Sequence, residues 1–207
     1  MVCKIDAPRS EYLFPTQIAL GEIKDFSTYQ QDLIDWIYEY ERKDHGDMIS
    51  NRGGYQSESK EIFTERSFRR FKNKIIPCIE EVSKEFHLTR PIEVASMWVN
   101  INGKFCYNTS HTHPGADLSG VLWVKQKPEF GSFVIENKES GFQIIPLVEA
   151  SKPSGWEHIS SKRIVPEYVP QYKDGTVCIF PAHLSHRVET NLTNEDRISI
   201  SFNIKIN

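Results

Sequence analysis

The chain has 207 residues, of which 39% are hydrophobic, 26% charged and 12% aromatic. This composition excludes a fully disordered chain, and the length fits a single domain over residues 1–207. The formal net charge of −3 disfavours a nucleic-acid partner, because such binding depends on attraction to phosphates. No stretch approaches 18 apolar residues, so we expect no membrane partner.

The four cysteines indicate a reducing compartment. Cys3, Cys78, Cys106 and Cys178 lie far apart and form no C-x-x-C pair, so neither disulfides nor structural zinc are expected. The first twelve residues carry charges but no apolar stretch, and we expect no secretory signal. The sequence therefore predicts a cytoplasmic protein and leaves its oligomeric state open, a homodimer included.

The first 90 residues carry a helical pattern. Apolar residues at three- and four-residue steps predict an amphipathic helix from about 27 to 42, and Ser27-Thr28-Tyr29-Gln30 has the form of a capping box at its start. A second apolar stripe over 68–86 predicts one helix, bent at Pro77 because proline removes a backbone donor. We expect residues 1–90 to form a helical part with two helices packed outside the core.

The pattern becomes strand-like over residues 91–207. Short runs rich in Val, Ile and aromatic residues alternate with Gly, Pro, Asn or Asp, and about eight such runs favour a sandwich or barrel. The predicted strands are 92–101, 118–125, 132–136, 143–149, 163–169, 176–180, 185–189 and 196–206. In the last one, isoleucine and phenylalanine alternate with Arg197, Ser199, Ser201 and Asn203, which predicts a polar face that meets a ligand.

Two histidine-containing segments are candidates for a metal site. His111 and His113 are two residues apart, so in a strand both point to the same side. A third imidazole from the later segment, which holds His183 and His186, would complete one face of an octahedron and leave three positions open. The simpler alternative is a pair of surface histidines before a turn at Pro114-Gly115.

Six segments in chain order form a further pattern: Leu13-Phe14-Pro15-Thr16, Gly53-Gly54-Tyr55-Gln56-Ser57, His111-Thr112-His113-Pro114, 118–124, 180–188 and Arg197-Ile198-Ser199-Ile200-Ser201-Phe202-Asn203. Taken together, these segments resemble a family of 2-oxoglutarate/Fe(II)-dependent oxygenases found in bacteria and phages. The resemblance implies a double-stranded β-helix, a cupin-like jelly-roll barrel of eight strands with helices outside. It also implies the cofactors Fe(II), 2-oxoglutarate and O2, and hydroxylation of an unidentified substrate.

The resemblance implies that His111 and His113 bind the iron together with the distal His186. It places a histidine where the wider superfamily usually has Asp or Glu, so the bound ion would be more positive. Asp117 is the alternative carboxylate in place of His113, provided that a loop folds it back. His183 is expected near the site without binding the metal.

The last strand offers groups for the cosubstrate. The distal carboxylate of 2-oxoglutarate needs a fixed cation, and Arg197 supplies two donors in one plane while Ser199 adds a hydroxyl on the same face. An Arg-x-Ser pair after the distal histidine is also a known superfamily arrangement. A surface salt bridge of Arg197 with Glu195 or Asp196 is the alternative. Asn100 and Asn203 are further candidates, either for the cosubstrate or for the backbone.

Two other functional classes remain open from the sequence. A cupin-type metal enzyme that does not use 2-oxoglutarate would keep the histidines but would not need Arg197 and Ser199. In a non-catalytic β-barrel binding module the histidines would be incidental. Small-molecule cosubstrate binding is expected in the preferred interpretation, and the prime substrate is left open.

Overall fold

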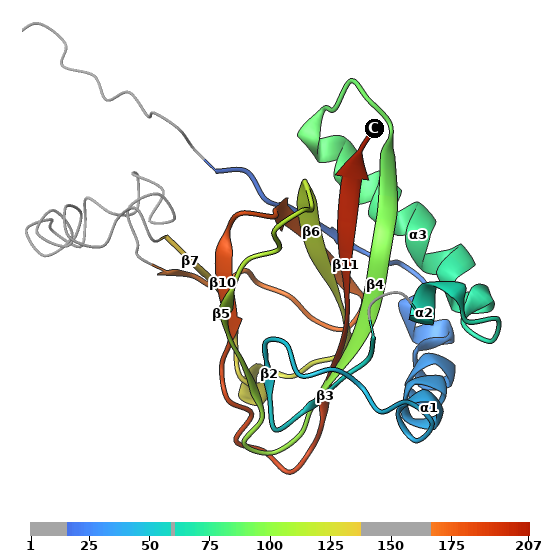
Figure 1. Cartoon of the computed structure of the whole chain (residues 1–207), viewed down its shortest axis with the longest axis vertical. Helices are drawn as coiled ribbons and strands as arrows, with labels where there is room; N and C mark the ends of the chain where they lie inside the picture. Colours follow the sequence, from blue (N-terminus) through green and yellow to red (C-terminus); the bar gives the residue numbers. More distant parts are fainter. Residues whose placement is uncertain (1–15, 59–60, 138–166) are drawn as a thin grey trace, which may run out of the picture.

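Two antiparallel sheets face each other in the computed structural model, which describes residues 16–58, 61–137 and 167–207 (Figure 1). Helices cover the outer face of one sheet, and the other sheet lies on the opposite side of the molecule. The chain is thus mainly β with flanking helices, which confirms the expected fold class. Among the described residues, no helix is long and apolar enough to cross a membrane.

The six-stranded sheet forms the centre of the molecule. Its longest strands, β4 and β11, pair along their whole lengths, and β6 pairs with the other edge of β11. In spatial order its strands are β1 (Ala19–Glu22), β9 (Thr176–Pro181), β6 (Leu118–Lys125), β11 (Arg197–Ile206), β4 (Ile92–Asn102) and β3 (Tyr55–Gln56).

The five-stranded sheet has shorter strands. In spatial order they are β2 (Asn51–Arg52), β5 (Tyr107–His111), β10 (Ser185–Val188), β7 (Phe133–Glu136) and β8 (Glu167–Tyr168). Five predicted strands after residue 91 coincide closely with β4, β6, β7, β9 and β11, and a sixth with β10. The predicted strand 143–149 lies outside the described residues, as does most of 163–169, of which 167–168 form β8.

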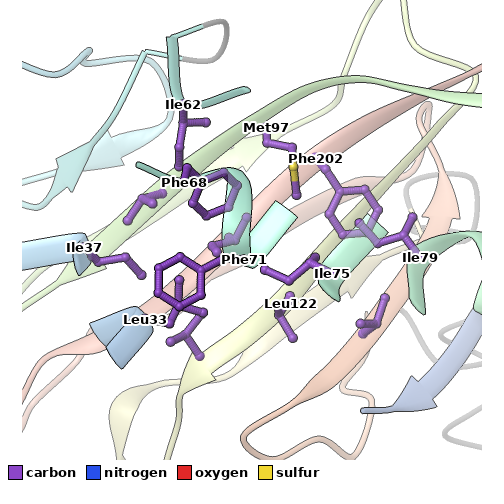
Figure 2. Close-up of a cluster of buried hydrophobic side chains, with 14 of the residues drawn as sticks. Leu33, Ile37, Ile62, Phe68, Phe71, Ile75, Ile79, Met97, Leu122 and Phe202 are labelled. Atoms are coloured by element: carbon purple, nitrogen blue, oxygen red, sulfur yellow. The ribbon is translucent and has the colours of Figure 1, made fainter. Parts of the chain in front are cut away.

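Three helices, α1 (Gln30–Glu41), α2 (Glu61–Thr64) and α3 (Arg69–Ser83), lie beside the six-stranded sheet. Figure 2 shows Leu33 of α1 and Phe71 and Ile75 of α3 meeting Leu122 of β6 and Phe202 of β11. These side chains belong to one large apolar cluster in which nearly every member is almost fully buried. Because side chains alternate along a strand, the burial of Phe202 on this face turns the polar residues of β11 to the other face.

The structure corrects two expectations about the N-terminal part. Residues 1–90 are not only helical, since β1, β2 and β3 lie there and extend both sheets, and α2 is a third helix. The capping box at 27–30 is wrong: a 3-10 turn spans Phe26–Thr28, and α1 begins after Tyr29 without a side-chain cap. The Thr28 hydroxyl instead donates to the Asp25 carbonyl oxygen. The second helix runs through Pro77, as expected.

Candidate metal and cosubstrate site

Three histidines converge between the two sheets. His111 ends β5 and lies directly opposite His186 of the antiparallel strand β10. His113 follows β5, and its backbone N–H donates to the Ala182 carbonyl oxygen, 2.9 Å away, just before β10 begins. The ligating nitrogens of the three rings all lie within 4.8 Å of one another. Strand pairing therefore brings together His111 and His186, which are 75 positions apart in the sequence.

Hydrogen bonds to backbone carbonyl oxygens determine which nitrogen is protonated in two of these rings. His111 Nδ1 lies 2.8 Å from the Thr109 carbonyl oxygen, and His186 Nδ1 lies 2.9 Å from that of Leu184. A carbonyl accepts only from a protonated nitrogen, so each Nε2 keeps its lone pair. His113 Nε2 and His186 Nε2 are 3.2 Å apart. Two adjacent ligands on one ion, with metal–nitrogen bonds of about 2.1 Å, need a separation of about 3 Å.

The environment keeps the three imidazoles uncharged. Burial lowers the pKa of His111, and burial together with the neighbouring His111 lowers the pKa of His113 to about 4 and that of His186 to about 3. The Phe180 and Phe133 rings lie 4.8 Å and 5.4 Å from the His186 ring and exclude water from it. Neutral imidazole is the form that binds a metal ion, so the site is ready for one near neutral pH.

The same cavity is lined by Arg197, Ser199 and Asn100 from the six-stranded sheet. Arg197 is only 3% exposed, and its Nε and Nη1 have no hydrogen-bond partner within the described part of the chain. Burial lowers its pKa to about 10, opposed by Tyr172, so the guanidinium stays charged at neutral pH. A buried cation with unpaired donors is costly unless an anion joins it.

The structure does not place Arg197 in a surface salt bridge. Glu195 pairs with Lys127, and Asp196 accepts a hydrogen bond from the Tyr38 hydroxyl. Both acidic side chains of the alternative interpretation are therefore engaged elsewhere, while Arg197 faces the cavity.

Three other candidates lie away from the histidine cluster. The Asp117 carboxylate accepts from the Ile206 backbone N–H at 2.9 Å, and it is absent from the metal-ligating cluster found among the described residues. His183 is exposed, and it too is absent from that cluster. Asn203 does not line the cavity: its amide bonds the hydroxyls of Ser119 and Ser96.

Sequence reasoning missed two polar residues that line the cavity, Asn108 and Ser50. Asn108 is three positions before His111, so a regular strand would turn the two side chains to opposite faces. However, β5 contains a bulge. His186 and Val188 of β10 are two residues apart, whereas their partners in β5, His111 and Asn108, are three residues apart. The extra residue returns Asn108 to the cavity face. Ser50 comes from the loop before β2, where no sequence pattern marks it.

Comparison with known proteins agrees with this geometry. Residues 96–203, just over half of the chain, match the model of the family described as "Putative 2OG-Fe(II) oxygenase". The chain belongs to this family. Its members are oxidoreductases that use Fe(II), 2-oxoglutarate and O2. No curated protein matches the sequence.

Solved structures share the fold at low sequence identity. HygX from Streptomyces hygroscopicus, with nickel and 2-oxoglutarate bound, is 14% identical over 92% of this chain and 83% of its own, with a TM-score of 0.57. A prolyl-4-hydroxylase from Pseudomonas putida is 8% identical over 93% of this chain and 94% of its own, with a TM-score of 0.59. An oxidoreductase of the 2OG-Fe(II) oxygenase family from Burkholderia pseudomallei is 12% identical over 89% of this chain and 91% of its own, with a TM-score of 0.57.

Proposed function

We propose that His111, His113 and His186 hold Fe(II), that Arg197 binds the distal carboxylate of 2-oxoglutarate, and that the enzyme hydroxylates a substrate C–H bond. One observation carries this proposal: a single cavity contains three uncharged imidazoles and, in the opposite sheet, a buried cation with unpaired donors. The first group suits a divalent metal ion, and the second suits a carboxylate.

The residues present fit the metal. Three imidazole nitrogens on one side of a site leave the remaining positions open, which an oxygenase needs for its cosubstrate and O2. Bound Fe(II) would activate O2, the oxidant, and so couple the oxidative decarboxylation of 2-oxoglutarate to hydroxylation of the substrate. HygX has been crystallised with iron and with nickel plus 2-oxoglutarate, which supports the assignment for this fold.

The protein's own residues orient the cosubstrate. Arg197 offers two donor nitrogens, Nε and Nη1, that have no partner in the described part of the chain, and in a buried cavity a charge-assisted contact with a carboxylate is strong. Ser199 lies directly opposite Asn100 in the β11–β4 pair, so both flank the expected position of the cosubstrate. The Asn100 amide donates to the Ser201 hydroxyl at 3.1 Å, which orients it. These contacts fix one end of the cosubstrate while the histidines receive the other.

The surrounding rings keep the reaction away from water. Trp98, Phe133 and Phe180 line the cavity beside the histidines, and the Trp98 ring lies 5.6 Å from the His113 ring. Excluding water strengthens the electrostatic contacts inside the cavity and limits side reactions. We expect the enzyme to act in the cytoplasm, where Fe(II) is kept reduced. Cys78, Cys106 and Cys178 are all free thiols, which supports that location.

The test is anaerobic titration of the Fe(II)-loaded protein with 2-oxoglutarate, monitored by the visible charge-transfer band of the chelate. The wild-type protein is expected to show a saturable band. Arg197→Ala is expected to keep its iron and to raise the KM for 2-oxoglutarate about 100-fold or more, because a buried charge pair is broken. Arg69→Ala, which removes an exposed arginine of α3, is the matched control and is expected to change neither.

An unchanged KM in Arg197→Ala would contradict the cosubstrate assignment. Iron binding without any band would favour a cupin-type enzyme that does not use 2-oxoglutarate. Absence of iron binding would contradict the metal assignment and favour the binding-module interpretation.

A further inference from the structure

Three polar side chains form a hydrogen-bonded row at the Arg197 end of the cavity. Asn102, the last residue of β4, lies directly opposite Arg197, the first residue of β11. Its Nδ2 donates to Asn108 Oδ1 of β5 at 3.0 Å, and Asn108 Nδ2 donates to Ser50 Oγ at 3.2 Å. Asn108 and Ser50 line the cavity together with Arg197. We call Asn102, Asn108 and Ser50 the amide relay.

Backbone contacts hold both ends of the amide relay in place. The Asn102 carbonyl oxygen accepts from Asn191 Nδ2 at 2.9 Å, and the Ser50 carbonyl oxygen accepts from the Thr109 backbone N–H at 2.9 Å. Asn102, Asn108 and Ser50 are 1%, 5% and 7% exposed. Because these side chains are shielded from bulk water, their polar atoms need partners inside the protein or on a ligand.

Both ends of the amide relay lack a partner among the described residues. Asn102 Oδ1 is buried and accepts no hydrogen bond. The Ser50 hydroxyl accepts from Asn108, but its own hydrogen has no acceptor in this part of the chain. Such buried groups are costly, and Nε and Nη1 of Arg197, on the neighbouring strand, are unsatisfied as well. One ligand that reaches both strands would therefore complete several groups at once.

The hydrogen bonds of the amide relay can run in either direction. The oxygen and the nitrogen of an amide occupy equivalent positions, and a hydroxyl both donates and accepts. After both amides turn over, Ser50 Oγ donates to Asn108 Oδ1, and Asn108 Nδ2 donates to Asn102 Oδ1. Asn102 Nδ2 then takes the position of the unsatisfied oxygen. Neither internal hydrogen bond is lost, so the surroundings of Asn102 decide between the two directions.

These surroundings change when a carboxylate joins Arg197. Side chains directly opposite each other in an antiparallel pair have Cβ atoms about 4.5–5.5 Å apart, so a carboxylate bound to Arg197 is within reach of the Asn102 amide. Without a ligand, an amide oxygen beside the guanidinium is favourable. Beside a bound carboxylate, an oxygen is repelled and an N–H donates a charge-assisted hydrogen bond. Cosubstrate binding therefore favours the reversed direction.

We propose that Asn102 binds the distal carboxylate of the cosubstrate beside Arg197, and that the amide relay reverses as it does so. Asn102 Nδ2 is the donor, while Asn108 and Ser50 are positioning residues that act through Asn102. No covalent bond changes, because the two amides only rotate. This inference rests on the proposed function, because it concerns the same cosubstrate.

The test compares two ligands of the Ni(II)-loaded protein, which does not turn over. 2-Oxopentanoate has the 2-oxo acid group of 2-oxoglutarate but a methyl group in place of the distal carboxylate. Isothermal titration calorimetry gives the Kd of each ligand, and the ratio measures what the distal carboxylate contributes. Asn102→Leu keeps the side-chain size but offers no donor. We expect it to raise the Kd of 2-oxoglutarate about tenfold and to leave that of 2-oxopentanoate unchanged.

Gln56→Leu is the matched control. Gln56 of β3 is 4% exposed, and its Oε1 also has no partner within the described ranges, but it lies opposite Asn100 and not opposite Arg197. We expect the Kd of both ligands to stay at the wild-type value. If Gln56→Leu raised the Kd of 2-oxoglutarate as much as Asn102→Leu, the loss would reflect removal of a buried amide from this sheet and would contradict the inference.

The role of Ser50 is tested in the same way, and this test does not depend on the stability of Asn102→Leu. Ser50→Ala removes the first donor of the reversed relay, so the Kd of 2-oxoglutarate should rise about threefold, and Ser50→Thr, which keeps the hydroxyl, should restore it. If Ser50 acts through Asn102, the double variant should lose no more affinity than Asn102→Leu alone. An unchanged Kd in Ser50→Ala would overturn the reversal of the relay.

The inference as a whole is overturned if Asn102→Leu keeps the wild-type Kd for 2-oxoglutarate, or if it weakens both ligands by the same factor. Arg197→Ala separates this failure from that of the proposed function. If Arg197→Ala retains the preference for 2-oxoglutarate, the proposed function itself is wrong. If Arg197→Ala loses that preference while Asn102→Leu retains it, only the role of Asn102 is wrong.

Discussion

The two sheets are stabilised in different ways. The six-stranded sheet packs against α1 and α3 through the large apolar cluster, where Leu33, Phe71 and Phe202 are almost completely buried. Between the sheets the apolar cluster is smaller and includes Trp123 and Phe133, and both apolar and polar side chains line the cavity there. The outer face of the five-stranded sheet instead carries a polar network in which Glu136 accepts from the hydroxyls of two serines.

The helix side of the six-stranded sheet therefore serves mainly the stability of the fold, and the interior between the sheets serves the proposed function. Burial of apolar surface on the helix side provides most of the folding energy, so that side tolerates few changes. The interior between the sheets contains buried polar groups, which cost stability unless a ligand joins them. Proteins commonly accept such a cost at functional sites. Substitutions in the two regions should therefore have separable effects on folding and on metal binding.

His186→Ala should have the largest functional effect. It removes one of three converging nitrogens, and we expect Fe(II) binding and turnover to be abolished while the protein remains folded. Calorimetric metal titration together with circular dichroism measures both. Asp117→Asn is the control, because this carboxylate bonds the Ile206 backbone away from the site, and it should bind metal normally. Loss of metal in Asp117→Asn would show that the carboxylate, and not His113, is the third ligand.

Phe71→Ala should show the opposite pattern. This α3 side chain is 2% exposed and packs against the Trp36 and Phe68 rings, so its truncation leaves a cavity on the helix side. We expect the free energy of unfolding to fall by about 3–5 kcal/mol, with an unchanged metal Kd for the folded protein. Urea denaturation and metal titration at low temperature measure the two quantities. A weakened metal affinity in the folded variant would argue against separable regions.

The free energy of unfolding of the metal-free protein should depend on pH because of the histidines in the cavity. We expect this effect to be smaller than the two above. The pKa of His113 is lowered to about 4 and that of His186 to about 3, both mainly by burial. Below pH 6.5 the unfolded chain takes up protons at these positions and the folded chain does not, so the protein loses stability as the pH falls. The slope is at most about 1.4 kcal/mol per pH unit for each histidine, and it vanishes above pH 6.5.

Urea denaturation from pH 7.5 to 5 in the presence of a chelator measures this slope. His113→Asn should give a shallower slope than wild type over the same range. Equal slopes would mean that His113 is not held uncharged by the fold.

Sequence reasoning succeeded where the decisive pattern is local. The alternation in 196–206 predicted the polar face of β11, and Arg197, Ser199 and Ser201 do line the cavity. Asn203 shares the alternation but does not line the cavity, and serines of β6 and β4 bond its amide, as in the structural alternative. Sequence reasoning missed Asn108, because a bulge changes which side chains share a face, and no local pattern marked that bulge.

The sequence by itself predicted the class of the protein, through its resemblance to the family, and it supplied the candidate site residues, because strand alternation and His-x-His spacing act within a few residues. The tertiary structure decided which of these residues meet. It selected His186 over His183, excluded Asp117 from the metal-ligating cluster and placed Asn102 opposite Arg197. These outcomes depend on the register between β5 and β10 and between β4 and β11, and register comes from the pairing of segments far apart in the chain.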